Sequence, residues 1–366
     1  MGRAGSVKLK RAAAAAVCLA TGFFLLRNAK AFASGVSIGL ELCAGALIPA
    51  LFPFMALAQF VCISDVSAMM SRPLKPITTG VFNLPPECGG ILLMSAIGGY
   101  PACARLIGRM AEQGKLTRRT AARMLCFCVN AGPSFLIGAV GAGMIGSVRA
   151  GTMLYASQML SALLIGLALS FTEKRGRWKS PVFAGNEPYS RAFVRSVTDS
   201  AQAMISMCAF VVIFCAVLEF LRSEGMISAA GELVGSIVPV ESGRIEPFLT
   251  GLVEITAGCA ATAGSLPLPV LAFLTSFSSL SVIFQISGQL AGSGVPMWSF
   301  ALSRVVHGAV SSAICLALIR IFPYSAAVLA NSGGRLVNSA SASGSAALLV
   351  MTAFFLLAVG KSRRID

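Results

Sequence analysis

Charged residues are scarce in this chain. Asp, Glu, Lys and Arg make up 12% of its 366 residues, whereas hydrophobic residues make up 56%. A soluble globular domain has about 25% charged residues. Several apolar runs approach the roughly 20 residues that cross a bilayer. The composition therefore argues against a soluble enzyme and predicts a polytopic membrane protein whose first partner is the lipid bilayer.

Histidine is almost absent, which narrows the possible chemistry. His307 is the one histidine in the sequence, so a metal cluster of Cys and His ligands is not expected. It is also the one candidate base for a Ser-His-Asp triad. The eleven cysteines fall mostly inside apolar segments, where free cysteine behaves as a small hydrophobe. We expect no enzyme, no catalytic residues, no metal and no cofactor.

The net charge of +15 has a placement that suits membrane topology better than nucleic-acid binding. Basic residues gather in short loops beside apolar segments, as the positive-inside rule requires for cytoplasmic loops. The stretch Arg222–Glu246 carries four glutamates instead, and we expect it to form an external loop. The basic stretches lie at residues 3–11, 72–75, 105–123, 174–195 and 361–364.

Each half of the chain contains two interrupted apolar segments followed by an unbroken one. Paired interruptions of this kind in two halves indicate a transporter-like binding site at a repeat interface. In the first half the order is Ser95–Pro101, Asn130–Ser134 and the unbroken Thr152–Phe171; in the second half it is Glu254–Gly258, Ser276–Leu280 and the unbroken Met297–Ile321.

The charge pattern gives these halves opposite orientations. We predict an all-α polytopic membrane protein with inverted repeats, about eight transmembrane helices and two re-entrant hairpins (Gly80–Ala104 and Phe248–Leu266), with both termini cytoplasmic. Ala31–Ala33 resembles a signal-peptidase site, so cleavage of the first segment stays open, although an uncleaved anchor is preferred. The predicted regions are 1–35 (anchor helix), 36–172 (first repeat), 173–196 (cytoplasmic basic linker), 197–322 (second repeat) and 323–366 (polar loop and last helix).

Six stretches follow one another in the order found in a known family of membrane proteins. They are Leu47–Phe54, Gly98–Arg105, Asn130–Gly138, Val253–Gly258, Ser279–Val282 with Gln285, and Leu302–Gly308. In these stretches the chain resembles the YlbJ-like sporulation integral membrane proteins, part of the nucleoside-recognition (Gate) domain group. It departs from that pattern at Ser279 and Leu280, where a glycine and an aromatic residue are common. The resemblance implies a Gly-rich helical membrane core and a role in spore cortex formation.

Glu254 is the strongest single candidate for the site. A carboxylate in the middle of an apolar segment is costly and usually faces a cavity or a partner. The functional interpretation is coordination of a ligand or cation. The alternative is a structural carboxylate that pairs with Arg304 or satisfies a helix N-terminus. The other predicted solute-binding residues are Thr256, Gly258, Ser95, Gly98, Gly99, Asn130, Gly132, Ser134, Ser276, Ser279 and Gln285.

Two functions remain open at this point. The first is a transporter-like protein that binds or moves a small polar solute, with a nucleoside among the possible solutes. The second is a non-transporting membrane scaffold that organises spore-envelope proteins, and a homo-oligomer is compatible with either. Nucleic acid is not an expected partner.

Overall fold

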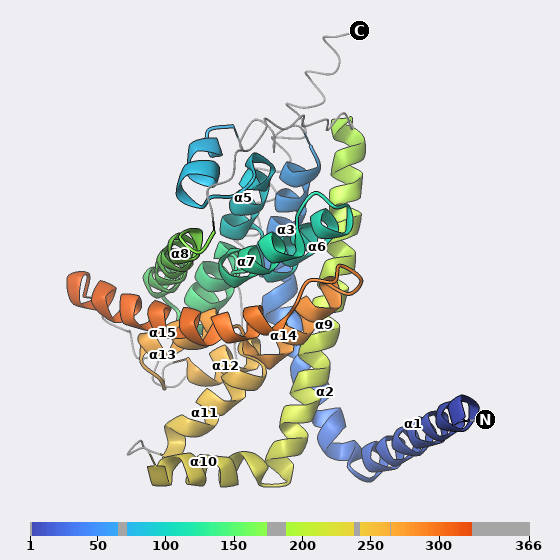
Figure 1. The fold of residues 1–366 in the computed structure, drawn as a ribbon. Coiled ribbons are helices and arrows are strands. Elements are labelled where there is room, and N and C mark those ends of the chain that lie inside the picture. The colour runs from blue at the N-terminus through green and yellow to red at the C-terminus, as the bar shows by residue number, and fades with distance from the viewer. Residues whose placement is uncertain (1, 65–71, 174–187, 238–241, 264, 324–366) are drawn as a thin grey trace.

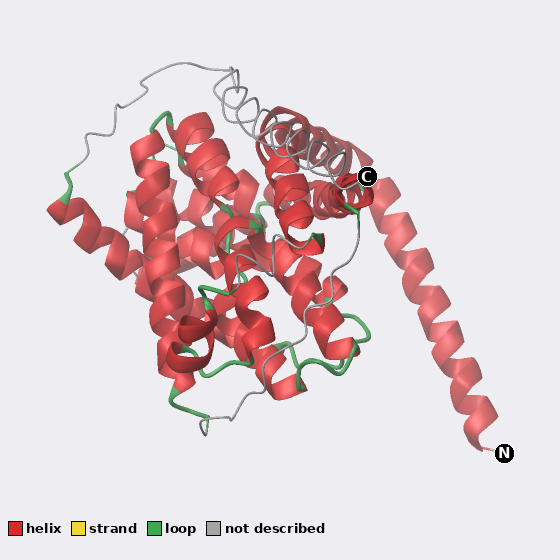
Figure 2. Cartoon of the chain, turned by 90° about the horizontal axis from the view of Figure 1, so that it is seen from above, coloured by secondary structure: helices red, strands yellow, loops and turns green. Residues whose placement is uncertain are grey.

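The computed structural model describes residues 2–64, 72–173, 188–237, 242–263 and 265–323, and every regular element in these ranges is helical. The helices form one bundle, and the first of them, α1 (Gly2–Arg27), extends away from it in both views (Figures 1 and 2). The all-α prediction is confirmed for the described part of the chain.

Five helical stretches in the described ranges are long and apolar enough to cross a membrane. The predicted last helix lies outside the described residues, and the predicted count of about eight is not established by these five. The five stretches are Ala29–Val61, α8 (Val148–Ser170), α9 (Tyr189–Ser223), Leu268–Gln289 and α15 (Trp298–Ile321).

The first of these stretches is continuous, but a π-helical turn interrupts its α-helical hydrogen bonding. It consists of α2 (Ala29–Leu42), the π-helical turn η1 (Cys43–Leu47) and α3 (Ile48–Ile63). Pro49 has no N–H to donate to the carbonyl four residues earlier. The wider turn lies directly before this proline, and its last bond runs from the Ile48 N–H to the Cys43 carbonyl. The π-helical turn thus takes up the irregularity that the proline imposes.

The four predicted interruptions are present in the structure. Gly98 separates α5 (Gly89–Ile97) from α6 (Gly99–Glu112), and residues 129–133 separate α7 (Arg118–Cys128) from the π-helix η4 (Ser134–Ile145). In the second half, Glu254 separates α11 (Ser242–Val253) from α12 (Ile255–Thr262), and Ser278 separates α13 (Leu268–Phe277) from α14 (Ser279–Gln289). The segments predicted to be unbroken are the continuous helices α8 and α15.

Two predicted loops are partly helical. The expected acidic loop Arg222–Glu246 contains α10 (Met226–Ile237) and the start of α11. Arg222 explains the error, because its guanidinium lies 3.1 Å from Glu246 and 3.6 Å from Glu219. One of the glutamates that suggested a loop, Glu246, connects α11 to Arg222 of α9 instead. Likewise α9 begins at Tyr189, inside the predicted linker 173–196.

Small residues allow the long helices to pack closely. A Cβ atom at Gly35 would lie 2.5 Å from the Cα of Ala216, and one at Gly39 would lie 2.7 Å from the Cα of Val212. Helix α2 therefore approaches α9 backbone to backbone, as small residues permit in membranes. Between α8 and α15, the hydroxyls of Ser157 and Ser311 lie 3.3 Å apart.

The turn between α13 and α14 depends on an unusual backbone conformation. Ser278 and Ser279 have φ angles of 75° and 55°, and Ser278 is fully buried. The left-handed region costs about 1–2 kcal/mol for most side chains and suits glycine.

We expect Ser278→Gly to keep or raise the thermal unfolding midpoint in detergent. Ser278→Val should lower it by an amount equivalent to about 1–2 kcal/mol, because a β-branched side chain disfavours this conformation. Ser287→Val on the exposed face of α14 makes the same chemical change in ordinary helix and serves as the control. Equal effects of the two valine substitutions would contradict the role of the turn.

Candidate functional site

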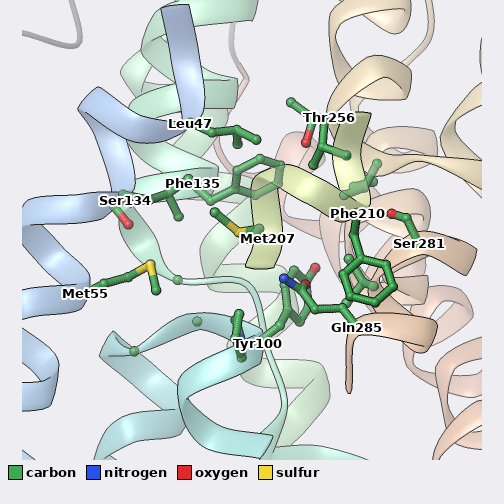
Figure 3. Close-up of a pocket in the computed structure, with 18 of the residues that line it drawn as sticks. Leu47, Met55, Tyr100, Ser134, Phe135, Met207, Phe210, Thr256, Ser281 and Gln285 are labelled. Atoms are coloured by element: carbon green, nitrogen blue, oxygen red, sulfur yellow. The ribbon is translucent and has the colours of Figure 1, made fainter. Parts of the chain in front are cut away.

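Three of the four interruptions, together with the helix α14 that follows the fourth, line one cavity. The cavity has an empty volume of about 640 Å³, including its open mouth. Figure 3 shows Met55 and Ser134 on one side of it and Phe210, Ser281 and Gln285 on the other. Its lining residues are Leu47, Leu51, Phe54, Met55, Ile97, Gly98, Gly99, Tyr100, Pro101, Gly132, Ser134, Phe135, Met207, Phe210, Val211, Glu254, Ile255, Thr256, Ser281, Val282 and Gln285.

Glu254 lies fully buried at the interruption between α11 and α12. One carboxylate oxygen, Oε2, accepts a 2.6 Å hydrogen bond from the backbone N–H of Ala257. Glu254 is thus the N-cap of α12, where an acceptor satisfies a free N–H and the helix dipole favours negative charge. Oε1 is 3.5 Å from the Ser281 hydroxyl at the start of α14. The carboxylate therefore lies between the first turns of two helices.

Serine and glutamine continue this polar wall along α14. The hydroxyls of Ser279 and Ser281 lie 3.0 Å apart, which links the positive-φ turn to Glu254. Gln285, one turn beyond Ser281, is 3% exposed, and its Nε2 has no hydrogen-bond partner in the described structure. A buried unpaired amide is costly, so this side chain is suited to a polar partner inside the cavity.

The opposite wall comes from the first half of the chain and is mostly backbone. Gly99 has a φ of 75°, and a Cβ atom at Gly132 would lie 3.3 Å from the Gly99 nitrogen. The two interruptions of this half therefore touch each other at glycines. Gly98 and Ser134 complete this part of the lining. Gly98, Gly99 and Gly132 therefore line the cavity with backbone atoms alone.

Seven of the predicted site residues line the cavity and five do not. The seven are Gly98, Gly99, Gly132, Ser134, Glu254, Thr256 and Gln285, and the five are Ser95, Asn130, Gly258, Ser276 and Ser279.

The residues outside the cavity hold the interruptions in shape. Asn130 donates 2.8 Å hydrogen bonds to the Ser95 hydroxyl and to the Phe127 carbonyl. This joins the break after α7 to the end of α5. A Cβ atom at Gly258 would lie 2.1 Å from the Cα of Gly251, so Gly258 is a contact between α11 and α12. Ser276 is buried and its hydroxyl has no partner in the described structure.

Two backbone groups expected to contact a ligand are already bonded. The N–H of Gly98 donates to the Met94 carbonyl at 2.8 Å, and that of Gly258 donates to the Glu254 carbonyl at 2.9 Å. These two N–H groups therefore already have partners within the chain.

Arg304 does not pair with Glu254. It is fully buried on α15 and donates to the carbonyls of Cys126 and Val129 at the end of α7, while its guanidinium carbon lies 4.8 Å from the Phe300 ring centre. A cation at a helix C-terminus satisfies carbonyls that have no partner in the helix. Of the two structural alternatives for Glu254, the helix N-terminus is the one observed.

His307 lies away from the cavity lining. Its Nε2 is 3.2 Å from the Gln158 carbonyl, and its own carbonyl accepts a 3.2 Å bond from the Ser161 hydroxyl. The histidine therefore connects α15 to α8. Tyr100 also connects two helices, because its hydroxyl donates to the Thr275 carbonyl near the end of α13. Unlike His307, it lines the cavity.

Sequence reasoning missed the apolar part of the lining. Phe54, Met55, Phe135, Met207 and Phe210 surround the polar wall, so the cavity is less polar than expected. These residues stand in segments that are apolar throughout, and no local pattern separates a side chain facing a cavity from one facing lipid.

One serine motif was also missed. A Gly-x-Ser-x-Gly spacing occurs at Gly35–Gly39. In α/β-hydrolases this motif forms a sharp turn between a strand and a helix, whereas here it lies inside α2 and its glycines contact α9. The spacing thus serves helix packing.

Comparison with known proteins and the apolar helices both indicate a membrane protein. No family model matches the sequence. The chain is similar to the sporulation integral membrane protein YlbJ of Bacillus subtilis (strain 168), with 23% identity over 308 residues, and the match covers 76% of each protein. The similarity and the five candidate spans together identify an integral membrane protein.

The glycine contact between α11 and α12 predicts a sharp difference between two alanine substitutions. Gly258→Ala should lower the stability in detergent by about 1–3 kcal/mol, because the added methyl group overlaps the backbone of Gly251. Gly288→Ala on α14 has nothing within 4 Å of the new atom and should be neutral or stabilising. Thermal unfolding of both variants checks the contact, and a harmless Gly258→Ala would contradict it.

Proposed function

We propose that this chain is a transporter-like membrane protein that binds or moves a small polar solute in the cavity lined by three of its interruptions and by α14. The observation that supports this most is the position of Glu254, whose buried carboxylate lines an otherwise largely apolar cavity together with Ser281 and Gln285. Ligand sites have this composition, with apolar walls and a few placed polar groups.

We further propose that the two halves are inverted repeats and that α5–α6 and α11–α12 are re-entrant hairpins. The contacts between halves support this because they are reciprocal: α6 of the first half contacts α14, and α12 of the second half contacts η4. The two unbroken helices α8 and α15 also contact each other. Irregular backbone at membrane depth survives where it lines a cavity.

The proposed biological setting is endospore formation. The relative's name supports this setting. The proposal extends to a Gate-like core, to a requirement in spore cortex formation and to a nucleoside-like solute. We also propose that the chain is not an enzyme, that it uses no cofactor or metal and that it binds no nucleic acid.

The role of Glu254 can be tested with purified protein and a panel of nucleosides and other small solutes. Binding followed by thermal shift should detect at least one solute, and Glu254→Gln should reduce its affinity by tenfold or more while unfolding remains cooperative. Glu246→Gln removes the same charge at the edge of the bundle, beside Arg222, and is the matched control. No binding by any solute, together with normal sporulation of the Glu254→Gln strain, would contradict the proposal.

The proposed orientation, with about eight transmembrane helices and both termini cytoplasmic, predicts the side of each loop. Reporter fusions at Arg118 and Lys179 should read cytoplasmic, and a fusion at Glu232 in α10 should read external, because basic loops stay inside. A cytoplasmic reading at Glu232 would contradict the inverted repeats.

A non-transporting scaffold is the second candidate. The basic connection between α6 and α7 favours it, because Arg109, Lys115, Arg118 and Arg119 are exposed and suit an acidic partner among spore-envelope proteins or a second copy of the chain. Charge reversal at Arg118 and Arg119 would then abolish sporulation, while substitutions in the cavity would have no effect.

A further inference from the structure

The charge of the cavity lining is one-sided. Glu254 is the one ionisable carboxylate in it, and none of the described residues that line it is Lys, Arg or His. Sites for phosphate and carboxylate groups normally use Arg or Lys for neutralisation. The described lining therefore has no positively charged side chain that could neutralise an anionic group of a solute.

The carboxylate of Glu254 has hydrogen-bond donors around it but no cation among the described residues. Oε2 accepts from the Ala257 N–H, Oε1 lies 3.5 Å from the Ser281 hydroxyl, and Thr256 also bonds the carboxylate through its N–H and its hydroxyl. The buried cation that could have paired with it, Arg304, donates to carbonyls at the end of α7 instead. An ionised carboxylate that leaves water is stabilised by an opposite charge. A cationic group of a solute could supply that charge.

Helix dipoles do not reverse this balance. The starts of α6, η4, α12 and α14 contribute to the lining, and each start carries a partial positive charge of about one half. However, each of these starts follows another helix end after at most five residues, and that end carries the opposite partial charge. The formal charge of Glu254 therefore determines the sign of the field in the cavity.

Gln285 adds a second polar contact beside the carboxylate. Its unpaired Nε2 can donate to an acceptor oxygen of the same solute. The rings of Phe135 and Phe210 form apolar surfaces of the same cavity. A solute with an N–H donor and an acceptor on an apolar or planar body would satisfy all three features.

We propose that Glu254 makes the cavity selective for cationic or uncharged solutes that present an N–H donor, and that phosphorylated and other anionic solutes are excluded. This inference rests on the proposed function, in which the cavity admits a solute. It excludes nucleotides even where the corresponding nucleoside or base is accepted.

Charged thiol reagents test the selectivity without knowledge of the natural solute. Ser134→Cys places a thiol in the cavity wall on the side away from Ser281 and Gln285 (Figure 3). The variant is treated in detergent with a cationic trimethylammonium methanethiosulfonate or with an anionic sulfonate methanethiosulfonate of similar size. Modification at position 134 is followed by tandem mass spectrometry, which separates it from the native cysteines. Each rate is divided by the rate of the same reagent with 2-mercaptoethanol.

The cationic reagent should react about tenfold faster or more after this correction, because the negative charge of an ionised Glu254 raises the local concentration of cations and lowers that of anions in the cavity. Adding Glu254→Gln should bring the ratio near one, whereas adding Glu246→Gln should leave it unchanged. Equal rates, an anionic preference, or no reaction with either reagent would overturn the inference. These outcomes are separate from a failed solute screen, which bears on the proposed function, because the reagents need only enter the cavity.

Discussion

The interruption of four apolar helices is the constraint on which the rest of the structure depends. Each interruption removes backbone hydrogen bonds, and lipid offers no water to replace them. The chain meets this need with buried polar side chains. Arg304 bonds the carbonyls at the end of α7, the Tyr100 hydroxyl bonds the Thr275 carbonyl, and Glu254 caps the start of α12. The buried charges of Arg304 and Glu254 thus lie at helix ends of the favourable sign rather than against each other.

This arrangement separates residues that maintain the interruptions from residues that face the cavity. Asn130, Ser95 and Gly258 belong to the first group, since they bond or pack between helix segments. Gln285, Thr256 and Ser134 belong to the second. Glu254 belongs to both, because one carboxylate oxygen caps a helix while the residue lines the cavity. Its substitution therefore has to be judged by binding and by folding together.

The sequence predicted the interruptions because Pro, Gly and Ser clusters and a lone carboxylate stand out within apolar runs. It could not predict on which side of a helix each residue lies. Asn130 and Gly258 were predicted to contact a solute. In the structure Asn130 bonds Ser95 and Phe127, and Gly258 packs against Gly251. Phe135 and Phe210 were missed because an apolar residue in an apolar segment carries no distinguishing signal. The acidic stretch after Arg222 was taken for a loop because its glutamates were counted without knowing that Glu246 of α11 pairs with Arg222 of α9.

The central claim is that the interruptions of both halves meet in one cavity inside the membrane. An electron cryo-microscopy structure of the protein in a lipid nanodisc measures this directly, because the density of the bilayer gives the depth of each residue. The proposed arrangement predicts Gly98–Pro101 and Glu254–Thr256 at the middle of the bilayer, facing a shared cavity. Finding these two stretches at opposite membrane surfaces with no common cavity would contradict it.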